Sequence, residues 1–295
     1  MKPLLFSWEA QNSLVDSVAA RLGAQVGALD RRRFPDGESY VRVLDDCSER
    51  PVILLAALSP PDERLLPLLL AAATLRDLGA KSIGLVSPYL PYMRQDATFH
   101  SGEGIAARHV GRIIAAHFDW LVTVDPHLHR FDDLADVYPL PTETLHAAPV
   151  IAQWVDENID TPLLIGPDSE SRQWVAAVAA HCDAPVEILT KQRFGDRHVE
   201  VSRPTGSVPD DHTPVLLDDI ISSGQTMIEA MKGLTPKCAR APVCIAVHGV
   251  FAAGAEEGLM SAGAACIVTT NTVAHATNAI DLATLIADGC RGFLR

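Results

Sequence analysis

The sequence is poor in aromatic residues, which make up only 5% of its 295 positions, although 48% of its residues are hydrophobic. Alanine, valine, leucine and isoleucine must therefore fill the interior. Aliphatic cores of this kind are common in proteins whose parallel strands are covered by helices on both faces. The length suits two domains of ordinary size or one large one.

Long hydrophobic runs and paired cysteines are also missing. The longest apolar stretch, residues 65–75, is interrupted by Pro67 and is too short to span a bilayer. We do not expect the first residues, MKPLLFSWEAQNS, to form a signal peptide or a membrane anchor. None of the six cysteines stands in a Cys-x-x-Cys pair or at zinc spacing, so we expect buried free thiols. The sequence predicts a cytoplasmic protein that does not bind membranes.

Positive charge is scarce, because 24 basic residues face 37 acidic ones and the net charge is −13. An acidic surface repels phosphate backbones, so general binding of nucleic acid is not expected. A phosphate-bearing ligand would have to be met by local lysine or arginine side chains, by backbone N–H groups or by a metal ion.

Short β-type runs alternate with helical runs along the whole chain. In the first half we expect strands at residues 4–7, 52–56, 82–87 and 121–124 and helices at 9–22, 62–78 and 103–117. In the second half we expect strands at 163–165, 186–189, 214–217, 243–247 and 266–268 and helices at 150–158, 171–181, 224–234, 256–262 and 281–287. This rhythm predicts α/β domains with mainly parallel sheets flanked by helices.

A faint internal repeat relates residues 52–89 to residues 214–251, since each reads strand, turn, helix, strand. It predicts two related domains, residues 1–143 and 144–295, joined near Pro139–Pro141.

The segment VLLDDIISSGQT, residues 215–226, carries the sharpest chemical signal. Four apolar residues lead into Asp218 and Asp219, at the strand end where ligands of α/β proteins bind. The loop that follows contains Ser222, Ser223, Gly224 and Thr226, and a helix begins at once. Small residues and a helix start suit an anion. A capped helix after a buried strand is the structural alternative, but it leaves two carboxylates without a cation or hydroxyl partner.

This segment resembles the phosphoribosyl pyrophosphate loop of phosphoribosyltransferases and phosphoribosyl pyrophosphate synthetases. Ser223 and Thr226 match hydroxyl positions of the family pattern, and Gly224 matches a small position. Ser222 stands where synthetases usually have an acidic residue, and Gln225 stands where glycine is usual.

Segments in the first half resemble the ATP-binding parts of the synthetases. RRFPDGESYVRV, residues 32–43, is similar to the segment that holds adenine, partly across a subunit interface, and this implies roles for Phe34, Asp36 and Glu38. SPYLPYMRQD, residues 87–96, implies ATP contacts by Arg94 and Gln95. The continuation at residues 100–103 is closer to archaeal members, so we expect the usual allosteric phosphate control to be altered or absent.

Three further segments complete the resemblance. VTVDPHLHRF implies that Asp125 and His127 carry over, with His127 a ligand of Mg²⁺ and His129 a weaker candidate. IGPDSESRQW places Asp168 near the ribose or metal, with Glu170 and Ser171 in place of the usual two glycines. TKQRFGDRHVEV resembles a catalytic flap, with Lys191 and Arg193 at its basic positions.

The resemblance to the ribose-phosphate pyrophosphokinase family implies a reaction. Ribose 5-phosphate would bind through Asp218, Asp219 and the loop of Ser222, Ser223, Gly224, Gln225 and Thr226. ATP would bind through the first domain, with His127 and Asp168 as metal ligands for Mg²⁺. Lys191 and Arg193 would act in transfer of the diphosphoryl group to the anomeric hydroxyl, with release of AMP. A homo-oligomer, at least a dimer, is expected.

Three alternatives remain open from the sequence. A phosphoribosyltransferase would keep residues 218–226 but would need no ATP site. A non-catalytic regulatory homologue is suggested by Ser222, Gln225, Glu170 and Ser171. A synthetase with a different sugar phosphate is permitted by the altered loop.

Overall fold

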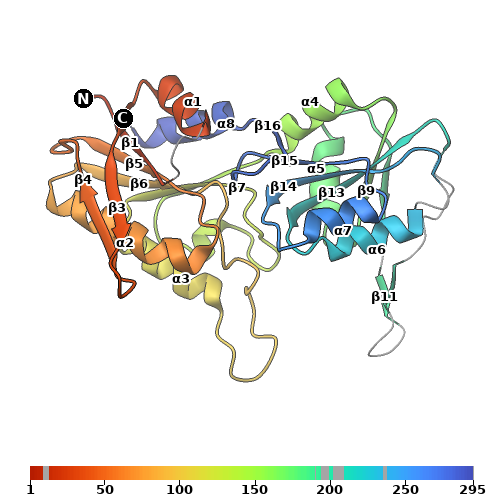
Figure 1. The fold of residues 1–295 in the computed structure, drawn as a ribbon, viewed down its shortest axis with the longest axis horizontal. Helices are drawn as coiled ribbons and strands as arrows, with labels where there is room; N and C mark the ends of the chain where they lie inside the picture. The colour runs from red at the N-terminus through yellow and green to blue at the C-terminus, as the bar shows by residue number, and fades with distance from the viewer. Residues whose placement is uncertain (9–12, 190, 194–198, 202–208, 235–237, 295) are drawn as a thin grey trace. The chain divides into compact units, whose positions relative to one another are not determined.

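The computed structural model describes residues 1–8, 13–189, 191–193, 199–201, 209–234 and 238–294, without the side chains of 191–193 and 199–201. The chain forms two compact units (Figure 1). The first contains Met1–His146 together with Leu282–Arg295, and the second contains Ala147–Asp281. Among the described residues, no helix combines the length and the apolar character needed to cross a membrane.

The first unit is built on a six-stranded parallel sheet with the order β2-β1-β5-β6-β7-β8. Its strands are β1 Leu4–Ser7, β2 Gln25–Gly27, β5 Pro51–Leu55, β6 Ser82–Val86, β7 Trp120–Val124 and β8 Thr142–Leu145. Its helices are α1 Ser13–Leu22, α2 Pro61–Asp77, α3 Ala106–Ala115 and α8 Ala283–Cys290, followed by the short η3 Arg291–Phe293, with η1 at Leu134–Asp136. Helices α2 and α3 cover one face of the sheet, and α1 and α8 cover the other (Figure 1).

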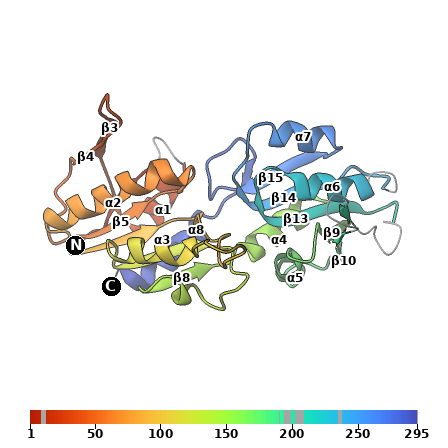
Figure 2. The same ribbon diagram turned by 90° about the horizontal axis from the view of Figure 1, so that it is seen from below.

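The second unit repeats this plan with the order β10-β9-β13-β14-β15-β16, again all parallel. Its strands are β9 Pro162–Gly166, β10 Val186–Ile188, β13 Thr213–Ile221, β14 Val243–Gly249, β15 Cys266–Thr270 and β16 Asn278–Ile280. Helices α4 Ala148–Asn158 and α5 Arg172–Ala179 lie on one face, and α6 Gln225–Leu234 and α7 Ala255–Ser261 lie on the other (Figure 2). Two parallel-sheet α/β domains flanked by helices confirm the predicted fold class.

The predicted aliphatic interior is present in both units. The central strands β5 and β14 bury nearly every side chain, because helices cover both faces of the sheets they belong to. Two of the aromatic rings that enter the core, Phe6 and Trp120, lie opposite a glycine on the neighbouring strand. Gly84 pairs with Trp120 across β6 and β7, and a Cβ atom on Gly84 would lie 2.0 Å from the indole ring.

Two antiparallel hairpins stand apart from the parallel sheets. Strands β3 Leu29–Arg33 and β4 Ser39–Val43 form one, for which the sequence indicated only a turn. Strands β11 Lys191–Arg193 and β12 Val199–Val201 form the other. Polar residues dominate β3 and β11, so these two strands lack the apolar pattern from which buried strands were predicted.

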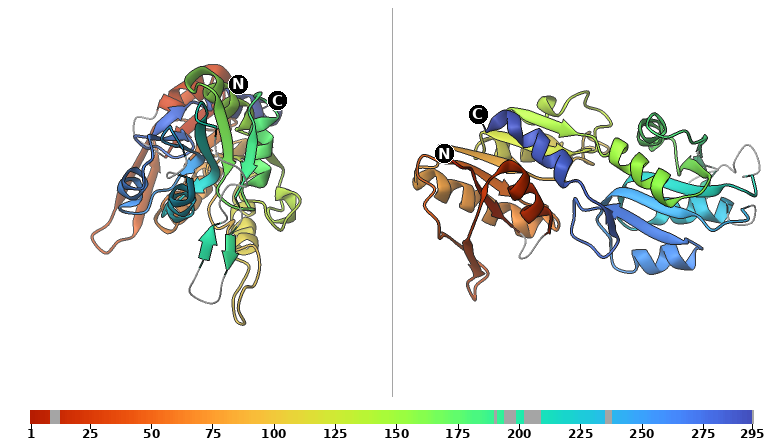
Figure 3. Two further views of the ribbon diagram at one scale, coloured as in Figure 1. Left: turned by 90° about the vertical axis from the view of Figure 1, so that its right-hand side faces the viewer. Right: turned by 90° about the horizontal axis from the view of Figure 1, so that it is seen from above.

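The division between the units differs from the expected domains of residues 1–143 and 144–295. Residue 143 lies inside β8, whose sequence TETL has little strand signal but which pairs with β7 as the last strand of the first sheet. The C-terminal segment also belongs to the first unit, where α8 packs against α1 (Figure 3) and Phe293 stacks on Trp120 with ring centroids 4.8 Å apart.

Candidate functional site

Three carboxylates gather at the carboxyl ends of β9 and β13 in the second unit. Strand β13 pairs with β9 only as far as Leu216, which lies opposite Ile165, whereas its pairing with β14 continues to Ile221. Asp218 and Asp219 therefore extend beyond the paired part of β9. Asp168 follows the end of β9 by two residues, which brings it to the same edge of the sheet.

The proximity of these three carboxylates is reflected in the pKa of Asp218. Burial raises the pKa of Asp218 well above its ordinary value, and the charges of Asp219 and then Asp168 raise it further. Asp219 is only 4% exposed. Carboxylates crowded in this way favour a cation or hydroxyl donors as partners.

The donor set suits a hydrated Mg²⁺ ion better than a metal enclosed by protein. Among the described residues, no three His, Cys, Asp or Glu side chains are arranged to surround a metal ion. Mg²⁺ normally keeps several waters and is held by one or two carboxylates together with substrate oxygens. Asp168 and Asp218 can supply such carboxylate oxygens.

The loop after β13 has the backbone geometry of an anion cradle. Gly224 adopts a φ of +72°, and a Cβ atom there would lie 3.1 Å from the side chain of Leu259. Helix α6 begins directly afterwards at Gln225, so its first N–H groups face the loop. The carbonyl of Ser222 accepts a hydrogen bond of 3.1 Å from the backbone N–H of Ala252, which holds the loop against the end of β14.

The unusual Gln225 is turned along the surface of α6. Its Nε2 donates to Glu229 over 2.6 Å, and Glu229 also accepts from Lys232 over 2.7 Å. The backbone N–H of Gln225 lies 3.4 Å from Ser223 Oγ. The side chain of Gln225 therefore does not fill the loop. The hydroxyl side chains that the loop offers are those of Ser222, Ser223 and Thr226.

Glu170 and Ser171, which stand in place of the usual glycines after Asp168, differ in their burial. The hydroxyl of Ser171, which is fully buried, donates to the carbonyl of Asp168 over 2.7 Å. The backbone N–H groups of Glu170 and Ser171 donate to Asp168 Oδ1 over 3.0 and 3.2 Å. Ser171 therefore closes the turn that presents Asp168, while Glu170 is exposed.

At the carboxyl end of β7 in the first unit, Asp125 is 8% exposed and has a φ of +34°. His146 Nδ1 lies 2.9 Å from Asp125 Oδ1, and this hydrogen bond raises the pKa of His146. Two residues further along, the ring centroids of His127 and His129 lie 4.1 Å apart. His146 was missed from the sequence, because one histidine after a polar strand carries no pattern.

The predicted ATP contacts Arg94 and Gln95 lie in the turn after β6. Arg94 is exposed, and the carbonyl of Gln95 accepts from the N–H of Ala107 over 3.3 Å, at the start of α3. Their neighbour Asp96 is 4% exposed and accepts from Arg130 Nη1 over 2.7 Å. This ion pair, which joins two of the predicted motifs, was also missed from the sequence.

The predicted adenine contacts Phe34, Asp36 and Glu38 occupy the tip of the β3–β4 hairpin, where all are exposed. The N–H of Phe34 donates to the carbonyl of Glu38 over 2.8 Å, and Asp36 Oδ1 accepts from the N–H of Glu38 over 3.1 Å. The tip is therefore an ordered turn that presents one ring and two carboxylates outward.

The segment at residues 100–103 is organised by one carboxylate. Glu103 Oε2 accepts from the N–H groups of Phe99 and His100 over 2.8 and 2.9 Å.

The predicted catalytic residues Lys191 and Arg193 lie in β11, and their side chains are outside the described part of the chain.

Comparisons with known proteins agree with this organisation. Residues 3–117 match the model of the N-terminal domain of ribose phosphate pyrophosphokinase, and residues 136–281 match that of the phosphoribosyl transferase domain. The ribose-phosphate pyrophosphokinase of Methanobrevibacter smithii is 30% identical over 98% of this chain and 100% of its own length. That of Methanosarcina mazei is 32% identical over 96% of this chain and 94% of its own length.

A solved structure supports the same assignment. The crystal structure of phosphoribosylpyrophosphate synthetase from Mycobacterium smegmatis superposes with a TM-score of 0.86 at 26% identity, covering 99% of both chains. Together with the full-length relatives, this similarity establishes that the chain belongs to the ribose-phosphate pyrophosphokinase family.

Proposed function

We propose that this protein transfers the diphosphoryl group of ATP to the anomeric hydroxyl of ribose 5-phosphate, giving phosphoribosyl pyrophosphate and AMP. The observation that carries the proposal is the group of Asp168, Asp218 and Asp219 beside a glycine-containing loop at a helix start. A pentose phosphate needs both features, because its hydroxyls require acceptors and its phosphate requires N–H donors.

Ribose 5-phosphate binds in the second unit in this proposal. Its phosphate lies against Ser222, Ser223 and Thr226 and the first N–H groups of α6. Its 2- and 3-hydroxyls donate to Asp218 and Asp219. The long β13 supports this arrangement, since it carries both carboxylates and leads directly into the loop.

ATP binds through residues of the first unit. Arg94 and Gln95 contact the phosphates, and the exposed tip with Phe34, Asp36 and Glu38 recognises adenine. Exposure of that tip supports an adenine site completed by a second copy of the chain, so we propose a homo-oligomer. A cytoplasmic location is proposed from the sequence.

We propose that His127 in the first unit and Asp168 in the second unit are each a ligand for Mg²⁺ when the substrates are bound. The ion supplies positive charge that offsets the developing charge on the transferring phosphoryl oxygens. Lys191 and Arg193 add positive charge to the same group, and their hairpin excludes water from it. The anomeric hydroxyl attacks the β-phosphorus in line, the bond from the β-phosphorus to the oxygen of AMP breaks, and positioning supplies much of the rate.

The direct test is release of AMP from ATP in the presence of Mg²⁺ and ribose 5-phosphate. Lys191→Ala should lower kcat by at least about 100-fold while binding of ribose 5-phosphate is retained, because the side chain acts in the transition state. Lys81→Ala, which removes an exposed lysine at the start of β6, is the matched control and should leave turnover unchanged.

The same assay separates the alternatives. Nucleotide binding without AMP release would favour a regulatory homologue, and release with another sugar phosphate but not with ribose 5-phosphate would correct the substrate. A protein that consumes phosphoribosyl pyrophosphate and does not bind ATP would overturn the proposal in favour of a transferase.

A further inference from the structure

The turn after β6 alternates between residues that are fixed in the core and residues that face solvent. Its start is held on the neighbouring strand, because the N–H of Val124 donates to the carbonyl of Pro88 over 3.2 Å. Leu90 and Met93 are buried in the apolar core of the first unit, whereas Arg94 is exposed. The direction in which Arg94 leaves the core is therefore set by the residues immediately before it.

Tyr92 has an unusual backbone conformation at this point. Its φ of +65° lies in the left-handed region, which a residue with a bulky side chain rarely adopts. The N–H of Gln95 donates to the carbonyl of Tyr92 over 3.3 Å and so closes a four-residue turn, of which Arg94 is the third residue. A conformation of this kind persists only where the surrounding contacts hold it, and such positions cluster at ligand sites.

Two contacts hold Tyr92 in this conformation. Its ring packs against the apolar core, and its Oη donates a hydrogen bond to Asp62 Oδ1 in the first turn of α2. Burial and then the bond to Asp62 raise the pKa of Tyr92 to about 12, so its hydroxyl remains a donor at neutral pH. The phenol thus ties the turn that presents Arg94 to the helix that follows β5.

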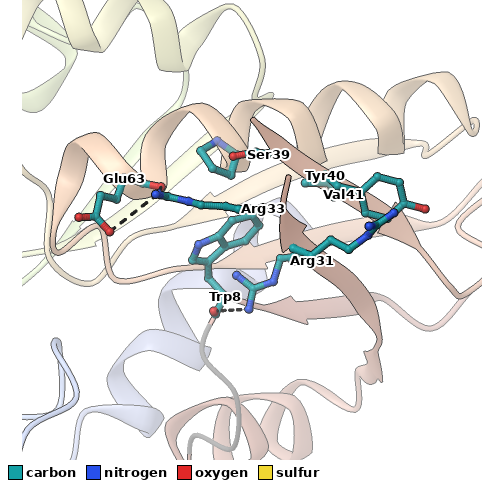
Figure 4. A pocket seen from close by; sticks show the side chains of 9 residues that line it. Trp8, Arg31, Arg33, Ser39, Tyr40, Val41 and Glu63 are labelled. Atoms are coloured by element: carbon teal, nitrogen blue, oxygen red, sulfur yellow. Dashed lines mark hydrogen bonds and ion pairs between the residues drawn. The ribbon is translucent and has the colours of Figure 1, made fainter. Parts of the chain in front are cut away.

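The first turn of α2 has two carboxylates, and they contact different neighbours. Glu63 faces the β3–β4 hairpin, where its carboxylate lies 3.8 Å from Arg33 Nη2 (Figure 4). Asp62 is the carboxylate that reaches Tyr92. The bond between Asp62 and Tyr92 can therefore be removed without changing either residue of the contact between α2 and the hairpin.

We propose that Tyr92 is a positioning residue for the nucleotide, which acts through Arg94 and is itself held by Asp62. This inference rests on the proposed function, in which Arg94 contacts the phosphates of ATP. A guanidinium group binds phosphate oxygens through paired N–H donors, so its contribution depends on its direction as well as on its charge. Loss of the bond to Asp62 lets the turn relax from its left-handed conformation and displaces the guanidinium group of Arg94.

Equilibrium binding of Mg·ATP and of ribose 5-phosphate, measured by titration calorimetry, tests the role of the bond. Tyr92→Phe keeps the ring and removes the donor, so it should raise the Kd for Mg·ATP about five- to tenfold and leave the Kd for ribose 5-phosphate unchanged. Asp62→Ala should have the same effect, and Asp62→Asn should restore wild-type affinity, because its amide oxygen still accepts the hydrogen bond. Asp77→Ala removes an exposed acidic side chain from the other end of α2 and, as the control, should change neither Kd.

A second pair of variants tests whether Tyr92 acts through Arg94. Arg94→Lys keeps the charge and loses the planar guanidinium group, so it should weaken binding of Mg·ATP by itself. If Tyr92 positions that group, adding Tyr92→Phe to Arg94→Lys should change the Kd by less than about twofold further. A role in stability alone would lower the melting temperature and would leave the effect of Tyr92→Phe on the Kd the same in both backgrounds.

Three results would overturn the proposal. They are wild-type affinity for Mg·ATP in Tyr92→Phe, an affinity in Asp62→Asn as low as in Asp62→Ala, and an undiminished effect of Tyr92→Phe in the Arg94→Lys background. All three leave the proposed function intact, because they require that the wild type binds Mg·ATP. A wild-type protein that does not bind Mg·ATP would instead overturn the proposed function together with this inference.

Discussion

Single residues determine the shape of the loop that we assign to the pentose phosphate. Gly224 has a left-handed backbone, and a Cβ atom there would lie only 3.1 Å from the side chain of Leu259, whereas Ser222, Ser223 and Thr226 contribute hydroxyls. Gln225, which departs from the family pattern, bonds to Glu229 and leaves the loop open. We therefore expect the loop to keep its capacity to bind a phosphate despite its altered sequence.

Gly224→Ala should destabilise the protein by about 1–2 kcal/mol, because alanine is strained at positive φ and its Cβ would press on Leu259. Binding of ribose 5-phosphate should weaken in parallel. Gly233→Ala lies within α6, the helix that follows Gly224, has open space around it and should be neutral or stabilising by up to about 1 kcal/mol. Chemical denaturation measures both variants, and equal effects of the two would contradict this explanation.

Asp218→Asn should stabilise the protein in the absence of metal and ligands and should abolish turnover. The folded-state pKa of Asp218 is raised, so the stability linked to its protonation is present below the unfolded pKa and is lost as pH rises through the folded value. Melting curves against pH should show the variant more stable than the wild type at neutral pH, with the difference vanishing near about pH 4. Mg²⁺ with ribose 5-phosphate should raise the melting temperature of the wild type only.

His146 should titrate above its ordinary pKa of 6.5, because Asp125 accepts its hydrogen bond. A raised pKa stabilises the folded state below pH 6.5, and this contribution disappears as pH increases through the folded-state value. Proton NMR can follow the ring in the wild type and in Asp125→Asn, where its pKa should fall back. A pKa that does not change in the variant would argue against this hydrogen bond.

At the scale of elements, short contacts between loops organise the part of the first unit assigned to ATP. The turn that contains Arg94 and Gln95 is tied to the segment after β7 by the pair of Asp96 and Arg130. Because Asp96 is buried and Arg130 is half exposed, the pair mainly gives Oδ1 of a buried carboxylate a charged partner, whereas Oδ2 has no hydrogen-bond partner among the described residues.

Arg130→Gln should therefore lower stability by about 1–2 kcal/mol and raise the KM for ATP more than that for ribose 5-phosphate. Arg112→Gln, an exposed change on α3, serves as the control and should alter neither. Thermal denaturation and steady-state kinetics provide the two measurements. A change in stability without any change in the KM for ATP would confine Arg130 to a structural role.

At the scale of the whole molecule, the chain leaves the first unit at His146 and returns to it at Leu282. The last helix covers one face of the first sheet beside α1, and Trp120 stacks on Phe293 beyond it. The first unit thus depends on residues that follow the second unit in sequence.

Deletion of residues 282–295 should unfold the first unit selectively, because it exposes apolar surface of the sheet and of α1. Limited proteolysis with mass spectrometry should find new cleavage sites within residues 1–146 and protection within 147–281. Preferential cleavage within 147–281 would assign the last helix to the second unit instead.

Local pattern in the sequence was enough for the α/β class, the two-unit plan, the buried strands and the residues of the β13 loop. Strand β13 and its carboxylates could be predicted because apolar runs, adjacent acids and a glycine signal lie next to one another in the chain. Tertiary structure alone decided the pairing of β8 with β7, the return of α8 to the first unit, and the contacts of His146 with Asp125 and of Arg130 with Asp96. Each of these joins segments far apart in sequence or uses polar residues without periodicity, so only folding reveals it.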